Sequence, residues 1–359
     1  MKDSLRYLLV CLLLLMPLSF SGCDMLPEEE DAGANILYVY SWGDYINEDV
    51  LKQFEEETGI HVVLDEYDTN ESMYPRIAEG AEAYDVLCPS DYMINKLIHN
   101  GLLQPLDFGN IPNANVYIDR DFYDQAKTFD REGKYTVPYC WGTVGIVYNK
   151  ELVKEPVDSW SILWKDEYRD EILMQNSARD SLMIALKLMG KSMNTTDAEE
   201  LEKAKDMLIA QKPLVQAYGV DDIRDKLVSE EAAMGVTFSG EAIKMMRKNP
   251  NLAFQIAPKE GTNVWIDGWV IPKNARHVEN AHRFIDFMCR PDIAAENFRS
   301  LGYSTPNTAV RTQVEDEFGE YMDIAFPSSK VYKGQESFRY LGEELDKLYT
   351  KLWLQVKVS

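Results

Sequence analysis

The residue with the clearest chemical potential is Asp267, which stands between two tryptophans, Trp265 and Trp269. A carboxylate beside indole rings can anchor a cation, because aromatic faces also attract positive charge. The same carboxylate could act as a catalytic acid, but no second group is paired with it by spacing. An ordinary turn or helix-capping acid is the structural alternative. The two tryptophans favour a binding residue.

Aromatic and polar residues also gather after two predicted strands. Residues 35–40 and 83–88 are rich in apolar and β-prone side chains, which predicts buried strands. Ligands of open α/β sheets bind beyond the carboxyl ends of the strands, so the loops after these two strands should meet at one edge. These loops carry Trp42, Asp44, Tyr45, Ser90, Asp91 and Tyr92.

The elements around these loops alternate between strand and helix. Helical spacing and stop signals predict helices at 48–58, 71–79 (with Asn70 as its N-cap) and 94–100, and a strand at 60–64. Further strands are expected at 143–149, 172–175, 232–238, 252–257 and 265–271. Further helices are expected at 179–189, 195–208, 221–228, 241–248, 278–289, 292–301 and 336–351. This order is typical of an α/β fold with an open, largely parallel sheet.

The chain is acidic, with 37 Lys and Arg against 60 Asp and Glu among 359 residues, a formal net charge of −23. Binding to nucleic acid independently of sequence needs an excess of basic residues, so this class is excluded. Attraction to anionic lipid is disfavoured for the same reason. The charge suits a cationic partner, although a large net charge also simply keeps proteins soluble.

The N-terminal segment is predicted to be a secretory signal. Lys2 and Arg6 precede an apolar run at 8–18 that is too short to span a bilayer, and small residues follow. The sequence at 19–23, Ser-Phe-Ser-Gly-Cys, resembles the lipobox of bacterial lipoproteins, although Phe20 stands where leucine is usual. We expect a signal peptide at 1–22, lipidation of Cys23 and a tether at 23–34. Ordinary cleavage beside an incidental cysteine is the alternative.

Cysteines and histidines give no catalytic or metal-binding pattern. Cys88, Cys140 and Cys289 have no CxxC spacing and are expected to be small core residues. His277 and His282 are five residues apart, whereas a zinc pair on a helix has i, i+4 spacing. No nucleophile elbow or glycine-rich phosphate loop is present in the sequence. We therefore expect no enzyme activity, no cofactor and no metal.

Six motifs in the chain resemble those of the extracytoplasmic spermidine/putrescine-binding proteins of bacterial ATP-binding-cassette (ABC) importers. They occur in the order of that family and span nearly the whole chain after the leader. One such motif alone is weak evidence, because the Glu-Thr-Gly-Ile turn recurs in many solute receptors, but the ordered set is specific. The motifs are Leu37–Tyr45, Phe54–Ile60, Tyr84–Tyr92, Val137–Gly142, Trp265–Pro272 and Gly302–Asn307.

The resemblance implies a type II periplasmic-binding-protein fold, with two α/β lobes joined by crossing strands and the ligand held in a cleft between them. The crossings fall near Gly142, Trp265 and Arg311, so lobe 1 comprises 35–142 and 266–311, and lobe 2 comprises 143–265 and 312–359. The implied partners are a linear polyamine and the subunits of an ABC permease. The protein is expected to be a monomer, exported and held at the cell membrane by its lipid, facing the periplasm or the extracellular side.

The resemblance also assigns roles to residues. Asp267 meets an amine nitrogen, Trp265 lies along the carbon chain, and Ser90 contributes a polar contact. Carboxylates are needed at the ammonium groups of a polyamine, and flat apolar walls along its methylenes. The matching wall or hydroxyl positions are Trp42, Tyr45, Tyr92 and Tyr303.

Other positions depart from the spermidine pattern. Two acids three residues apart grip one terminal amine in the family, whereas this chain has Ser177 and Asp180. Phe238 stands where a tryptophan is frequent, and Phe338 stands near a frequent glutamine. Asp44 and Glu241 are candidates for replacement charge, with Asp91 a further acid that could face the ligand. These changes leave open whether putrescine or spermidine is the preferred ligand.

Three alternatives remain at this stage. A receptor of the same fold could bind a sugar, an amino acid, another amine or an anion such as ferric citrate, although an anion receptor should place Arg or Lys in the cleft loops. A sensory or adhesion lipoprotein with a closed, non-binding cleft would share every fold signal. Catalysis is the third alternative.

Overall fold

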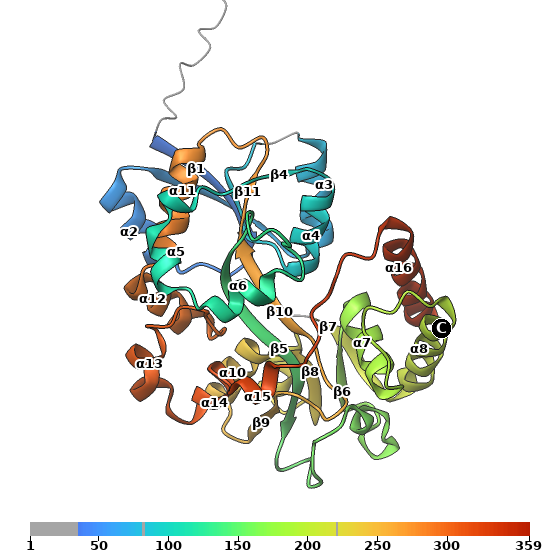
Figure 1. Ribbon diagram of the computed structural model, residues 1–359. Helices are drawn as coiled ribbons and strands as arrows, with labels where there is room; N and C mark the ends of the chain where they lie inside the picture. Colours follow the sequence, from blue (N-terminus) through green and yellow to red (C-terminus); the bar gives the residue numbers. More distant parts are fainter. Residues whose placement is uncertain (1–34, 81–82, 220–221) are drawn as a thin grey trace, which may run out of the picture. The chain divides into compact units, whose positions relative to one another are not determined.

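The computed structural model describes residues 35–80, 83–219 and 222–359, which fold as a mixture of helices and sheets (Figure 1). The predicted signal, the tether and Cys23 lie outside the described residues. Within the described part of the chain, no helix combines the length and the hydropathy that a membrane crossing requires.

The first sheet has three parallel strands in the order β2 (His61–Tyr67), β1 (Ile36–Trp42) and β3 (Val86–Leu87). The connecting helices are α2 (Glu48–Thr58), α3 (Asn70–Glu79) and α4 (Asp91–His99). Phe54 of α2 meets Phe284 of α11 (Val278–Met288) with ring centroids 5.3 Å apart. The predicted βαβ order of this region is confirmed, and the carboxyl ends of β1 and β3 lie side by side, as expected.

The second sheet is mixed, with strand order β10–β5–β8–β6–β7 and β9 paired to β5. Its strands are β5 (Val137–Asn149), β6 (Ile172–Gln175), β7 (Val215–Gly219), β8 (Met234–Phe238), β9 (Leu252–Gln255) and β10 (Val264–Trp269). β5 is antiparallel to β8, β9 and β10, so the expectation of a largely parallel sheet is wrong here. The sequence could not reveal this direction, because almost every residue of β5 is buried and its apolar run carries no directional pattern.

β5 is longer than predicted. It spans 13 residues and includes the motif at 137–142, so it continues through Gly142 without a break. β10 lies beside β5 (Figure 1). Trp265 of β10 pairs with Gly142 of β5 in this ladder. Two of the three predicted crossing positions are therefore neighbours in one strand pair, while the division of the chain into lobes stays a prediction.

The remaining elements are short or cover the sheets. β4 (Leu103–Gln104) and β11 (Ile271–Pro272) form a two-stranded ladder. The other helices are α5 (Pro112–Tyr117), α6 (Arg120–Ala126), α7 (Ala178–Leu188), α8 (Ala198–Gln211), α9 (Asp222–Val228), α10 (Ser239–Lys248), α12 (Pro291–Leu301), α13 (Arg311–Phe318), α14 (Met322–Ala325), α15 (Ser329–Tyr332) and α16 (Glu343–Val358). Short 3-10 turns lie at Phe108–Asn110, Trp160–Trp164, Asp166–Tyr168, Lys212–Leu214 and Gly319–Tyr321.

Several predicted helix starts are wrong, such as 195 for α8, which begins at Ala198, and three of the errors bear on the site. The N-cap of α3 is Thr69, whose side chain forms a capping box with Ser72, so Asn70 is already helical. α4 begins at Asp91, which places Asp91 and Tyr92 in its first turn. The last helix begins at Glu343 instead of 336, because Glu336 forms a bridge with Asn263 next to β10.

One buried acid holds the first sheet to α11. Asp85 is fully buried and accepts hydrogen bonds from the backbone nitrogens of Tyr38 (3.0 Å), Arg276 (2.9 Å) and His277 (2.8 Å). Its carboxylate also contacts Nδ1 of His277 at 2.9 Å. This one side chain therefore satisfies backbone donors from β1 and from the two residues that precede α11.

We expect Asp85→Ala to destabilise the protein by about 2–4 kcal/mol, because three buried backbone donors lose their acceptor. Urea unfolding followed by circular dichroism measures the change. Asp49→Ala, which removes an exposed carboxylate paired with Lys52, is the control and should change stability by less than about 0.5 kcal/mol. Equal stability of the two variants would contradict the role assigned to Asp85.

Candidate functional site

The centre of the site is Asp267, in the middle of β10 and only 4% exposed. One oxygen, Oδ2, accepts a 2.7 Å hydrogen bond from the Tyr45 hydroxyl. The other, Oδ1, is buried and has no hydrogen-bond partner in the described part of the chain. Burial raises the pKa of Asp267 from 3.8 to about 7, while hydrogen bonds from Tyr45 and Ser90 oppose this rise. One oxygen of this buried carboxylate therefore has no hydrogen-bond donor in the described part of the chain.

Backbone pairing brings two distant segments to Asp267. In the ladder it lies opposite Cys140 of β5, and an isolated bridge pairs it with Ser90 at the end of the β3 loop. The ladder shifts register between Asp267 and Gly268. A side chain at Gly268 would place its Cβ 2.4 Å from Thr136, so only glycine fits beside the acid.

Aromatic rings surround the carboxylate, as predicted. Tyr303 lies between Tyr45 (ring centroids 5.8 Å apart) and Trp265 (5.3 Å). Phe238 meets Trp265 edge-on at 6.0 Å, and Trp42 lies 6.5 Å from Tyr45. The structure thus brings together Trp42, Tyr45, Phe238, Trp265, Tyr303 and Asp267.

Two glycines create the room for these rings. A Cβ at Gly142 would lie 2.6 Å from the Trp265 ring, and a Cβ at Gly240 would lie 2.2 Å from Tyr303. Both glycines therefore allow close approach of an aromatic ring to the backbone. The other tryptophan beside Asp267, Trp269, is fully buried against Tyr139 and Phe284, and so belongs to the core.

A second buried acid lies at the start of α7. Ser177 is the N-cap of this helix, and its hydroxyl accepts a 3.3 Å hydrogen bond from the backbone nitrogen of Asp180. Asp180 is 8% exposed, and its Oδ1 has no hydrogen-bond partner among the described residues. Burial raises the pKa of Asp180, whereas Ser177 and Arg179 act to lower it. Ser177 caps the helix while Asp180 keeps an unsatisfied oxygen.

Tyr92 and Phe338 form a second aromatic pair. Their rings meet edge-on with centroids 6.3 Å apart, and Phe338 is only 5% exposed. The Tyr92 hydroxyl donates to Oε1 of Glu71 at 2.8 Å and accepts from Asn70 at 3.2 Å. Arg179 lies 4.6 Å from the centroid of Phe338 and 5.9 Å from that of Tyr92. Sequence reasoning missed the roles of Asn70, Glu71 and Arg179.

Three further predicted acids lie in different surroundings. Asp91 is fully buried, and one of its oxygens accepts a 2.7 Å hydrogen bond from the Tyr92 nitrogen in its own helix. Burial raises the pKa of Asp91 well above its usual range. Glu241 already forms ion pairs with Lys244 (2.8 Å) and Arg224 (3.3 Å). Asp44 is exposed at a turn with φ of 52°. A ligand contact for these three acids stays a prediction.

No cluster of three metal-ligating side chains occurs within residues 35–80, 83–219 and 222–359. Cys88, Cys140 and Cys289 are buried free thiols, which confirms their prediction as core residues. The Nε2 of His282 accepts a hydrogen bond from the Asp107 nitrogen at 2.9 Å, so this histidine has a structural partner. The site that the structure brings together is thus one of acids and aromatic rings.

Comparison with known proteins places this site in a family. The family description of bacterial extracellular solute-binding proteins matches residues 49–324. The chain is a bacterial extracellular solute-binding protein. The spermidine/putrescine-binding periplasmic protein of Escherichia coli K12 is 34% identical over 84% of this chain and 86% of its own length. The putrescine-binding periplasmic protein SpuD of Pseudomonas aeruginosa is 29% identical over 91% of this chain and 93% of its own.

Solved structures agree with the fold of this solute-binding protein. The substrate-binding protein PotD of a spermidine/putrescine ABC transporter from Streptococcus pneumoniae is 39% identical, covering 90% of this chain and 99% of its own, with a TM-score of 0.79. The TpPotD lipoprotein of Treponema pallidum is 25% identical, covering 90% of this chain and 100% of its own, with a TM-score of 0.80. The predicted type II periplasmic-binding-protein fold is confirmed.

The raised pKa of Asp267 predicts how stability depends on pH. Folding raises this pKa from 3.8 to about 7, so the stabilisation from its bound proton is complete below about pH 4 and lost as the pH rises through 7. Asparagine keeps the shape without the charge. We therefore compare the change in unfolding free energy that Asp267→Asn causes in the ligand-free protein at two pH values. We expect this change to be about 2–4 kcal/mol more stabilising at pH 8 than at pH 5.

Thermal unfolding of both proteins between pH 5 and pH 8 measures this difference. Asp49→Asn, at an exposed position, is the control and should show a difference that does not change with pH. An Asp267→Asn effect that is constant from pH 5 to pH 8 would contradict the burial argument.

Proposed function

We propose that the protein captures a linear polyamine, putrescine or spermidine, outside the cytoplasm and delivers it to the permease of an ABC importer. The observation that carries the proposal is the buried Asp267 carboxylate, with one unsatisfied oxygen among the rings of Tyr45, Trp265 and Tyr303. The names of the relatives support the same ligand class.

The chemistry of the site fits an alkyl-ammonium ligand. An ammonium group bound at Oδ1 of Asp267 would stabilise the ionised carboxylate and offset the cost of its burial. Aromatic faces attract ammonium groups by about 0.5–2 kcal/mol each and also cover methylene groups. Asp180, with its unsatisfied oxygen, supplies a second acid. A dissociation constant of about 1 μM corresponds to about −8 kcal/mol, which two ammonium–carboxylate contacts and several ring contacts can supply.

An anionic ligand is disfavoured by the charges at the site. Arg179, the basic residue next to Asp180, is 9% exposed and donates hydrogen bonds to the Arg339 carbonyl and to Asn194. Two of its guanidinium nitrogens are therefore engaged inside the protein, while its buried Nε has no hydrogen-bond partner in the described part of the chain. The unsatisfied side-chain atoms of Asp267 and Asp180 are acceptors. A neutral sugar or an amino acid would leave at least one of these acids without a cation, which is costly when buried.

Calorimetric titration tests the ligand class. We expect putrescine or spermidine to bind with a dissociation constant of about 1 μM or tighter, because both charge and apolar contacts match. A neutral diol of the same length is the matched control and should give no heat. The assignment would be overturned if putrescine, spermidine and spermine all gave no heat at concentrations that would detect tens of micromolar affinity. Recovery of a chemically altered polyamine after incubation with the protein would also overturn it.

Removal of the charge on Asp267 tests the anchor. We expect Asp267→Asn to weaken polyamine binding by about 2–5 kcal/mol, since a buried ammonium would lose its counter-charge. Asp49→Asn, at an exposed acid outside the candidate site, is the control and separates a local contact from the general negative field. Equal affinities of the wild type and Asp267→Asn would remove Asp267 from the site.

The lipid anchor is a separate proposal from the sequence, because Cys23 lies outside the described residues. We expect labelled palmitate to be incorporated into the full-length protein in a bacterial host and to be lost in Cys23→Ala. The variant should then appear in the soluble envelope or culture fraction. Equal labelling of both proteins would contradict lipidation at Cys23.

A further inference from the structure

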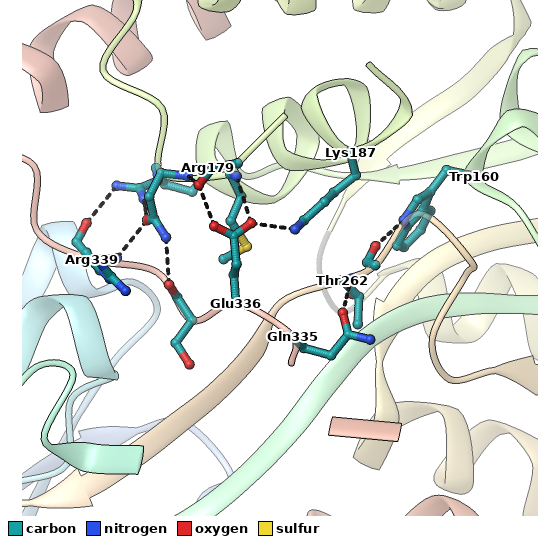
Figure 2. A network of polar contacts seen from close by, with 12 residues as sticks. Trp160, Arg179, Lys187, Thr262, Gln335, Glu336 and Arg339 are labelled. Carbon is teal, nitrogen blue, oxygen red and sulfur yellow. Dashed lines mark hydrogen bonds and ion pairs between the residues drawn. The ribbon is translucent and has the colours of Figure 1, made fainter. Parts of the chain in front are cut away.

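The segment 335–339, which we call the strap, runs beside the strand that carries Asp267. The backbone nitrogen of Val264 donates to the Glu336 carbonyl at 2.9 Å, and the Ser337 hydroxyl donates to the Val264 carbonyl at 2.6 Å. The backbone nitrogen of Thr262 donates to Oε1 of Gln335 at 3.0 Å (Figure 2). The strap is therefore fixed along one side to the start of β10.

Asn194 fixes the other side of the strap. Its Nδ2 donates to the Ser337 carbonyl at 2.8 Å, and its Oδ1 accepts from the Arg339 nitrogen at 2.9 Å. One amide side chain thus holds the residues on both sides of Phe338. This contact needs a donor and an acceptor in the same group, which among side chains of this shape is the property of an amide.

Arg179 sets the orientation of the Asn194 amide and supports the ring of Phe338. Its Nη2 donates to Oδ1 of Asn194 at 3.0 Å, so this oxygen must face the arginine. Its Nη1 donates to the Arg339 carbonyl at 3.3 Å. The guanidinium also lies 4.6 Å from the Phe338 centroid and 4.7 Å from that of Tyr349, so it is held between two rings.

Glu336 anchors the strap to helix α7 and to the turn after it. Its carboxylate is paired with Lys187, whose side chain is 10% exposed, and accepts from the Ser192 hydroxyl and the Met193 nitrogen (Figure 2). Burial acts to raise the pKa of Glu336, but the hydrogen bonds from Lys187 and Ser192 outweigh it and the pKa is lowered. The anchor is consequently an ion pair at neutral pH.

From these contacts we propose that Asn194 is a positioning residue of the ligand site, which acts by fixing the strap so that Phe338 lies against Tyr92. The proposal rests on the proposed function, because Phe338, the ring that it positions, is one of the residues expected at the ligand site. Asn194 itself need not touch the ligand. Its whole effect on binding should pass through the Phe338 side chain.

A double-mutant cycle tests this route. We expect Asn194→Ala to weaken putrescine binding about tenfold when Phe338 is present, and less than about twofold in a Phe338→Ala background. The two single variants and the double variant are compared with the wild type by calorimetric titration, alongside thermal unfolding to confirm that each protein is folded.

Two variants keep the test informative. Asn194→Asp retains the acceptor oxygen for Arg179 and Arg339, replaces the donor to Ser337 by a second acceptor and adds a negative charge, and it is used in place of Asn194→Ala if that protein does not fold. Asn249→Ala removes another amide that links two backbone groups, the Val228 carbonyl and the Asn251 nitrogen, and it should leave binding unchanged.

The outcomes separate the two proposals. Weakening of equal size in both backgrounds, or no weakening in either, overturns the role of Asn194 while polyamine binding by the wild type stands. Absence of polyamine binding by the wild type overturns the proposed function and, with it, this role.

Discussion

The cost of burying the Asp267 carboxylate is the constraint on which the rest of the site depends. A buried charge is tolerated only when it is paired or hydrogen-bonded, and here the protein supplies donors to part of the group alone. The Tyr45 hydroxyl donates to Oδ2, while Oδ1 has no donor among the described residues. An environment of this kind disfavours ionisation until a cation arrives, which links ligand binding to the release of a proton near neutral pH.

The glycines around Asp267 exist for the same site, although they carry no chemistry. Gly142, Gly240 and Gly268 each lie where a Cβ would approach a neighbouring side chain to less than 3 Å. At Gly142 and Gly240 that neighbour is an aromatic ring, which can approach the backbone only because these two positions have no side chain, whereas at Gly268 it is Thr136. The rigidity of the walls thus comes from strands β5 and β10 and the start of α10, and only the acid and the rings are left to contact a ligand.

Sequence reasoning recovered the parts of the molecule with local signals. The helix at 48–58 matches its predicted bounds, and Trp42, Tyr45, Trp265 and Asp267 lie together as expected because they follow strand ends or lie within a strand. The antiparallel direction of β5 was not predictable, since its buried run looks the same in both directions. Asn194 and Arg179 were missed because their roles depend on a segment about 140 to 160 residues away, with which they share no local pattern.

The net charge of −23 is weak evidence for the ligand, because most acids that could serve a cation are already engaged. Glu241 is paired with two basic residues, Glu336 with Lys187, and Glu71 accepts from Tyr92. Asp267, Asp180 and Asp91 differ from these acids, because each is buried and keeps one oxygen without a donor in the described part of the chain. A buried acceptor without a donor is costly, so these three acids say more about a cationic ligand than the total charge does, although they contribute little to that total.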